Sequence, residues 1–212
     1  MVRVSVFLLL QLAVYTQQQG LELPNPKACA DRVNHSHTQR NGHHYFFSWK
    51  HRDTSNRRLD WFNARNNCRH NCQDLVSMET QSESKFVLDI VERENVNSVW
   101  TSGRKCNFDG CDEPHLQPIN INGWFWSANQ KRMPPTNKKG GWRGDWSNKG
   151  GAGTQQPDNR EGNEACLGIL NNKFGDGVTW HDLNCNQHNI WICEDSQELL
   201  QYARSKTNLN IP

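Results

Sequence analysis

Eight cysteines constrain this chain more than any other feature of its sequence. Arg3 precedes an apolar run from Val4 to Val14, and the chain then turns polar at Gln17. This is the pattern of a secretory signal peptide, which we assign to residues 1–20. Because a secreted chain folds under oxidising conditions, an even number of cysteines predicts disulfides rather than metal thiolates. We therefore expect a secreted, extracellular and disulfide-stapled protein.

Length, charge and hydrophobicity narrow the class of protein further. A single core commonly organises roughly 100 to 200 residues, so the chain has room for one domain after a leader is removed. The net charge is +2, from 24 basic and 22 acidic residues, which favours neither nucleic acid nor an anionic membrane as a partner. The leader's apolar run is about half of the ~20 residues that a membrane span needs. We expect no nucleic-acid partner and no membrane span.

The two ends of the chain carry little periodicity. Residues 21–44 are polar, rich in Pro, Asn and His, and show no period that could bury a face, so we interpret them as an N-terminal extension tied down by Cys29. Residues 195–212 are interpreted as a C-terminal tail. The extension contains the one Asn-x-Ser/Thr site of the chain, at Asn34, which a secretory route would expose to glycosylation.

Two helices are predicted between these ends. Asp60 is a suitable N-cap for the first, which carries a stripe with spacings of three and four. Thr80 and Glu83 form the capping box of the second, which we expect to end near Asn95. The first stripe consists of Trp61, Ala64, Cys68 and Cys72, and the second helix presents Phe86, Val87, Ile90 and Val91 to the core.

The remaining apolar segments are short and indicate strands, which makes the fold class α+β. They lie near residues 45–49, 99–101, 124–126, 165–170, 178–180 and 190–193. The stretch 127–160 is rich in Gly and Pro and almost without period. A loop of that length inside a compact domain is usually functional.

Short motifs in a fixed order carry a family likeness over residues 45–194. In chain order they are Trp61-x-x-Ala64-x-x-x-Cys68, Leu75-Val76-Ser77, Val99-Trp100-Thr101-Ser102-Gly103, Trp124-Phe125-Trp126, Gln156-Pro157-Asp158, Glu164-Ala165-Cys166, Trp180-His181-Asp182, and Cys185 with Cys193. This order resembles the signature of the C-type lectin-like domain, and the extra cysteines resemble its secreted arthropod members. The resemblance implies two helices packed on short antiparallel sheets, with a long irregular binding loop.

The resemblance also implies how the cysteines pair. Its two core disulfides correspond here to Cys68–Cys193 and Cys166–Cys185. Cys106 and Cys111 bracket an Asp-Gly turn that could bring their sulfurs together, and the fourth pair is then Cys29–Cys72. A competing interpretation takes Cys68, Cys72 and His70 as zinc ligands, but no second ligand pair has a matching spacing.

The sugar site of this family is a calcium ion in the long loop. Carried over to this chain, its ligands would be Gln156, Asp158, Glu164 and Asp182, which supply the oxygens that calcium prefers. Pro157 fits the cis peptide of the family. The Gln-Pro-Asp order resembles galactose-type members, because it exchanges the positions of the acceptor oxygen and the donor amide.

Three residues complicate this assignment. His181 stands where the family has an asparagine, and an imidazole nitrogen is a poor partner for a hard cation. The aromatic residue that usually follows the galactose-type motif is replaced by Asn159 and Arg160. We therefore expect weaker calcium binding.

Trp142 lies in a glycine-rich segment where little else could bury it, and it is a candidate for sugar contact together with Gln156, Asp158, Glu164 and His181.

The expected function is calcium-dependent carbohydrate binding with a galactose-type motif, in extracellular recognition or adhesion. The expected partners are glycans or glycoproteins, with an extracellular matrix protein as a further possibility. The alternative is a C-type lectin-like module that has lost sugar binding and engages a protein or matrix partner. An enzyme would need a nucleophile held by a base, or paired carboxylates in a cleft. Asp158 and Glu164 are already assigned to calcium, so we predict no catalysis.

Overall fold

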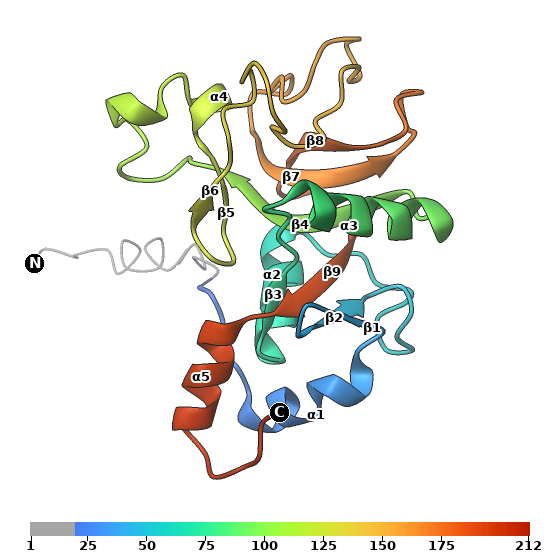
Figure 1. Ribbon diagram of the computed structural model, residues 1–212, viewed down its shortest axis with the longest axis vertical. Coiled ribbons are helices and arrows are strands. Elements are labelled where there is room, and N and C mark those ends of the chain that lie inside the picture. Colours follow the sequence, from blue (N-terminus) through green and yellow to red (C-terminus); the bar gives the residue numbers. More distant parts are fainter. Residues whose placement is uncertain (1–19) are drawn as a thin grey trace, which may run out of the picture.

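The computed structural model describes residues 20–212, and all but the last residue of the predicted signal peptide lies outside this range. Helices and short strands are interspersed along the described chain (Figure 1). The α-helices of the described part are α1 (Pro26–His35), α2 (Trp61–His70), α3 (Gln81–Arg93), α4 (Ile119–Asn122) and α5 (Gln197–Ser205), with a 3-10 turn η2 at Pro114–Leu116. The strands are β1 (Thr38–Arg40), β2 (His43–Phe47), β3 (Gln73–Leu75), β4 (Ser98–Lys105), β5 (Trp124–Trp126), β6 (Lys131–Arg132), β7 (Glu164–Asn171), β8 (Val178–Asn184) and β9 (Ile190–Asp195).

Strand β9 lies at the centre of the topology (Figure 1). The strand order is β1-β2-β9-β4-β5-β6, with β3 also on β9, and with β7 between β4 and β8. The pairs are antiparallel except for β4 with β9, where Trp100 lies opposite Trp191 in parallel register. The predicted α+β fold is confirmed. The parallel β4–β9 pair differs from the expectation that all strand pairs would be antiparallel.

Helix α2 begins where the sequence predicts. Asp60 accepts a hydrogen bond of 2.8 Å from the backbone N–H of Asn63, and the fully buried Trp61 donates from Nε1 to the carbonyl oxygen of Thr101 at 2.8 Å. The helix ends at His70. The placement of Cys72 on the helical stripe is wrong, because Cys72 has a φ of 58° and already lies beyond the helix. It is nevertheless fully buried.

Helix α3 carries the predicted capping box between Thr80 and Glu83. It ends at Arg93, two residues before the predicted end at Asn95. Val87, Ile90 and Val91 are buried, and Phe86 is half-buried with its ring edge-on to Tyr45. The helix covers one face of the sheet in front of β4 and β7 (Figure 1).

Large aromatic side chains fill much of the core. Trp126 and Trp146 both meet Trp180 edge-to-face, at ring-centroid distances of 5.4 and 5.8 Å, a favourable geometry for indole pairs. Six tryptophans of this core are each 5% exposed or less, namely Trp100, Trp124, Trp126, Trp146, Trp180 and Trp191.

The N-terminal extension is a folded part of the molecule, so the prediction that residues 21–44 bury no face is wrong. Asn25 caps α1, and Cys29 and Arg32 on this helix are buried. β1 then pairs with β2. The two buried positions are a cysteine and an arginine, whose burial rests on a disulfide and an ion pair. A search for apolar periodicity therefore cannot find this helix.

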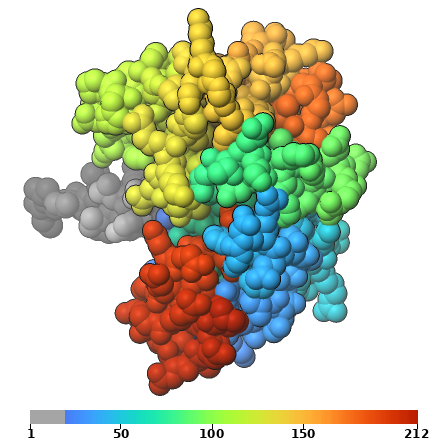
Figure 2. Space-filling view, in the orientation of Figure 1, coloured from blue at the N-terminus to red at the C-terminus, as the bar shows by residue number. Residues whose placement is uncertain are grey.

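The C-terminal segment 195–212 is likewise more than a tail. Helix α5 buries Leu199, Leu200 and Ala203 against Cys29 and Cys72, and Ile211 is also buried in this cluster. Figure 2 shows the two ends of the described chain side by side at one end of the molecule. Of the helices in this range, none has both the length and the apolar character needed to cross a membrane.

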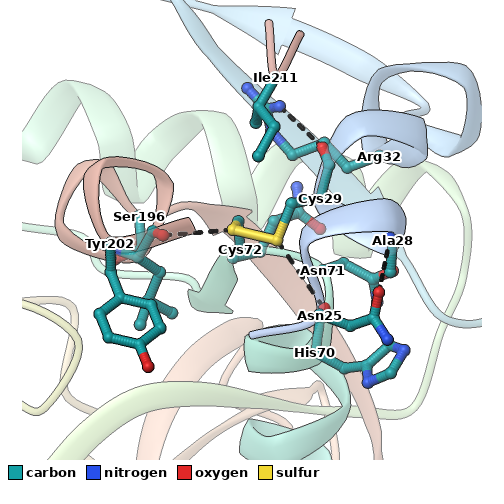
Figure 3. The surroundings of a disulfide bond; sticks show 12 residues. Asn25, Ala28, Cys29, Arg32, His70, Asn71, Cys72, Ser196, Tyr202 and Ile211 are labelled. Carbon is teal, nitrogen blue, oxygen red and sulfur yellow. Dashed lines mark hydrogen bonds between the residues drawn. A yellow bond between two sulfur atoms is a disulfide. The ribbon is translucent and has the colours of Figure 1, made fainter. Parts of the chain in front are cut away.

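Four disulfides hold the described chain together, and they are the four pairs expected from the sequence: Cys29–Cys72, Cys68–Cys193, Cys106–Cys111 and Cys166–Cys185. Figure 3 shows the first of them between the two terminal helices. Arg32 Nη1 donates to the Cys29 carbonyl oxygen beside it at 3.0 Å. The remaining pairs close the central domain, the loop before α4, and the β7–β8 strands.

Candidate functional site

Three carboxylates converge at the end of the β7–β8 hairpin. Asp158 lies in the long loop, Glu164 begins β7, and Asp182 lies on β8. One oxygen from each lies within 4.8 Å of the others. Calcium binds oxygens at about 2.3 to 2.6 Å, so two ligands on opposite sides of one ion are at most roughly 5 Å apart. The spread of the three carboxylates therefore fits a single calcium ion.

Asp182 fastens the loop to strand β8. Its side chain is 1% exposed, and its Oδ1 and Oδ2 accept hydrogen bonds from the backbone N–H groups of Asp158 at 3.1 Å and Asn159 at 2.7 Å. These bonds fix the loop backbone immediately beside the carboxylate cluster. The position of Asp158 thus depends on Asp182.

Local bonds hold the other two carboxylates in place. Asp158 Oδ2 accepts from the Thr154 hydroxyl at 2.8 Å, and Oδ1 accepts from the backbone N–H of Arg160 at 3.1 Å. Glu164 Oε2 accepts from the backbone N–H of Glu161 at 3.3 Å. The loop between Asp158 and Glu164 therefore donates a backbone hydrogen bond to each of the two acids that flank it.

The cluster concentrates negative charge in a partly buried place. Burial raises the pKa of Glu164 above its ordinary value, and the charge of Asp182 raises it further. Burial also raises the pKa of Asp182, although the N–H groups of Asn159 and Asp158 work against this shift. A divalent cation would offset both the repulsion and the loss of hydration.

Lys105 is a charged neighbour that sequence reasoning missed. It is buried on β4, where burial lowers the pKa of its ammonium while the charges of Asp182 and Glu164 raise it. Its Nζ donates to Asn120 Oδ1 at 3.2 Å, and Asn120 Nδ2 donates to the carbonyl oxygen of Pro157 at 2.8 Å. Nothing in the sequence distinguishes this lysine from a surface one on an edge strand.

Gln156 lies immediately before the cluster in the chain. The Gln156–Pro157 bond is cis, and the Gln156 backbone N–H donates to the Ser147 carbonyl oxygen at 2.8 Å. The buried side-chain amide of Gln156 packs against Gly150. The contact is so close that a Cβ atom on residue 150 would lie 2.1 Å from Gln156 Nε2. Within the described structure, no hydrogen bond joins this amide to the three carboxylates.

His181 does not join the cluster that the described acids form. Its Nε2 lies 2.9 Å from Asp176 Oδ2 and 3.2 Å from the Thr179 hydroxyl, and the side chain is 2% exposed. Burial lowers the pKa of His181, although the charge of Asp176 raises it. Asp176 also accepts from the Ser147 hydroxyl at 2.5 Å. The imidazole thus belongs to a buried network that ties the hairpin to the long loop.

The two remaining predicted positions lie apart from these bonds. Trp142 is half-buried, with its indole edge-on to Trp180 at 5.7 Å and its Nε1 donating to Asp145 Oδ2 at 3.3 Å. The indole of Trp142 thus packs the long loop against β8. Asn34 is exposed in the last turn of α1, where a glycan could attach, and its glycosylation stays a prediction.

Comparison with known proteins adds sequence and fold evidence. A family model described as the lectin C-type domain matches residues 57–195. L-selectin of Rattus norvegicus is 25% identical over 165 residues, which cover 78% of this chain and 35% of that protein, so the chain spans about a third of that relative's length. The C-type lectin domain of murine dendritic cell inhibitory receptor 2, solved in complex with an N-glycan, aligns with a TM-score of 0.50 at 16% identity, over 76% of this chain and 95% of that one. The carbohydrate-recognition domain of the human scavenger receptor C-type lectin aligns with a TM-score of 0.49 at 20% identity, over 77% and 97% of the two chains.

Proposed function

This chain belongs to the C-type lectin domain family, and we propose that it binds carbohydrate through a calcium ion held by Asp158, Glu164 and Asp182. The convergence of these three carboxylates within 4.8 Å is the observation that supports the proposal. We further propose that the protein is secreted and acts in extracellular recognition or adhesion. Its partners would be glycans or glycoproteins, and its role would be binding rather than catalysis.

The residues around the cluster would have different roles in binding. A bound calcium ion would supply open coordination positions for two neighbouring sugar hydroxyls. Asp182 would hold both the ion and the loop backbone, since its oxygens already fix the N–H groups of Asp158 and Asn159. Glu164 would contribute its carboxylate from the rigid start of β7. The buried Lys105 would remain beside the acids and limit their excess negative charge.

The order of the loop residues supports a galactose-type preference. Gln156 and Asp158 flank Pro157, so the amide precedes the proline and the carboxylate follows it. At a bound ion, this order would set on which side a sugar hydroxyl accepts a hydrogen bond and on which side it donates one. On this basis we propose galactose-like sugars as the class of ligand.

A glycan array tests the proposal directly. The wild-type chain is applied with millimolar calcium and again with a chelator, beside Asp158→Ala and the matched control Asp89→Ala, which removes an exposed carboxylate on α3. We expect signals on glycans with terminal galactose that vanish with chelator and in Asp158→Ala, and that persist in Asp89→Ala. Signals that survive the chelator would refute a calcium-dependent site.

One observation favours the second candidate, a module that engages a protein or matrix partner without sugar. Both oxygens of Asp182 and both oxygens of Asp158 already accept hydrogen bonds from the protein, so these two side chains are held in place without an ion. Thermal melting separates the two functions, because a ligand of the native state raises the midpoint. A midpoint that does not move between chelator and millimolar calcium would favour the second candidate.

A further inference from the structure

An open groove of about 550 Å³ is lined by residues of α4, β5 and β6. These elements lie together on one side of the molecule (Figure 1). None of the three clustered carboxylates lines the groove. Its walls come from the end of β4, the Cys106–Cys111 loop, the η2 turn, the end of α4 and β5–β6, and Leu21 and Arg65 complete the lining. The groove is therefore a separate feature from the proposed calcium site.

One wall of the groove is aromatic and open to solvent. Phe108 is 56% exposed, and its ring stands edge-on to Phe125 at 6.0 Å. Phe108 lies within the small loop closed by the Cys106–Cys111 disulfide, which restricts the movement of its backbone. Leu116 adds a further apolar side chain to the lining. Exposed apolar surface of this kind, rimmed by polar groups, marks interaction sites.

Arg104 provides an uncompensated positive charge in the groove. Its guanidinium carbon lies 5.0 Å and 4.7 Å from the ring centres of Trp61 and Phe62, and Nη2 donates to Asn107 Oδ1 at 3.1 Å. Its buried Nε has no hydrogen-bond partner in the described structure. A buried charged donor that lacks an acceptor is costly, and an anion would offset this cost.

Arg132 adds a second such charge. Its Nη2 donates to the carbonyl oxygens of His115 at 3.3 Å and Asn122 at 3.1 Å, which are neutral acceptors. Arg65 also lines the groove, but its Nε lies 2.9 Å from Asp74 Oδ1, so its charge is already balanced. Among the residues that the structure describes, no aspartate or glutamate lines the groove. The groove thus combines two free guanidinium charges with an apolar wall.

We propose that this groove binds an acidic peptide segment of a protein partner, with a carboxylate at Arg104 and Arg132 and an adjacent apolar side chain against Phe108 and Phe125. Guanidinium groups pair with carboxylates through charge-assisted hydrogen bonds. The two guanidinium charges favour an anionic partner over a neutral glycan. The open shape suits an extended chain more than a small apolar molecule, which needs an enclosed pocket.

Selection from a random dodecapeptide library displayed on phage tests the proposal, with the full chain immobilised in the presence of a calcium chelator. We expect enriched peptides with Asp or Glu within two positions of Phe, Trp or Leu. A synthetic peptide of the enriched sequence is then titrated by fluorescence anisotropy. The loss of one charge-assisted contact should weaken its binding about tenfold in Arg104→Gln and in Arg132→Gln.

Two further variants separate binding from folding. Phe108→Ser changes an exposed side chain and should weaken peptide binding without lowering the thermal midpoint. Arg52→Gln removes a 97% exposed arginine elsewhere on the surface and should leave the affinity unchanged. No enrichment, or a peptide whose affinity is the same in Arg132→Gln and Phe108→Ser as in the wild type, would overturn the proposal.

The remaining outcomes identify other occupants and would also overturn it. Peptides that bind equally well after their apolar residues are changed to Ser would indicate simple charge attraction. Displacement of the peptide by a sulfated oligosaccharide but not by free acidic peptides would indicate a glycan site. A dimer in sedimentation that dissociates in Phe108→Ser would indicate a second copy of this chain.

Discussion

Arg32 and Asp195 form a buried, two-bond ion pair between helix α1 and the end of strand β9. Arg32 Nε donates to Asp195 Oδ1 at 3.1 Å, Nη2 donates to Oδ2 at 3.3 Å, and both side chains are at most 3% exposed. Gln73 Nε2 also donates to Oδ1 at 3.1 Å. This pair fastens the N-terminal helix to the central strand of the fold.

Replacing Arg32 with Ala should therefore destabilise the whole chain. The change leaves the Asp195 carboxylate buried without its positive partner, which typically costs about 3 to 5 kcal/mol. Urea unfolding of Arg32→Ala against the wild type measures the loss. Lys27→Ala, at an exposed position of the same helix, should change stability little. Equal midpoints for all three proteins would show that α1 is only loosely attached.

Loss of the Cys29–Cys72 disulfide should cost more stability than loss of Cys106–Cys111. The two pairs are 43 and 5 residues apart in sequence, and the chain-entropy model gives about 4 and about 2 kcal/mol for loops of these lengths. Serine pairs at each site, compared by urea unfolding, measure the two losses. A smaller loss for Cys29 and Cys72 would mean that the terminal helices contribute little to global stability.

The sequence predicts the central domain well because its signals are local. The N-caps Asp60 and Thr80, together with apolar spacings of three and four, locate the two main helices within a few residues. The terminal segments differ, since their burial depends on distant partners: Cys29 bonds to Cys72, and Arg32 pairs with Asp195, 163 residues away. No local pattern can reveal such contacts.

The candidate site likewise combines features that the sequence predicts with features that it does not. The convergence of Asp158, Glu164 and Asp182 follows from the order of the motifs. The hydrogen bond between His181 and Asp176 does not, because Asp176 lies in the turn before β8 and belongs to none of the motifs. From the sequence alone, a histidine next to a calcium ligand is expected to be a ligand itself. In the structure this histidine forms a hydrogen bond with Asp176.

The change His181→Asn should lower stability and leave calcium affinity unaltered. Asparagine is shorter than the imidazole and would leave Asp176 Oδ2 with a weaker buried partner, at a cost of about 1 to 3 kcal/mol. Urea unfolding and a calcium titration by calorimetry measure the two effects, with His188→Asn as a control at an exposed position. Tighter calcium binding in His181→Asn would show that the ring blocks a ligand position.

The calcium-dependent rise in thermal midpoint should shrink as the pH falls from 7.5 to about 5. The folded-state pKa values of Glu164 and Asp182 lie above their ordinary values of 4.5 and 3.8. Without an ion, this raised proton affinity stabilises the native state fully below those ordinary values, and the contribution is lost as the pH rises through the folded-state values. Calcium opposes that loss, because it binds the same ionised carboxylates that protons would otherwise neutralise.

Differential scanning fluorimetry in chelator and in millimolar calcium, repeated across this pH range, measures the effect. At pH 7.5 a larger fraction of both acids is ionised than at pH 5, so the calcium shift should be largest there, since native-state binding raises the midpoint. Near pH 5 protons compete for Glu164 and Asp182, so the shift should fall. Asp158→Ala should show little shift at any pH, because it removes one of the three ligands. A calcium shift that is constant with pH, or that survives in Asp158→Ala, would place the ion at other residues.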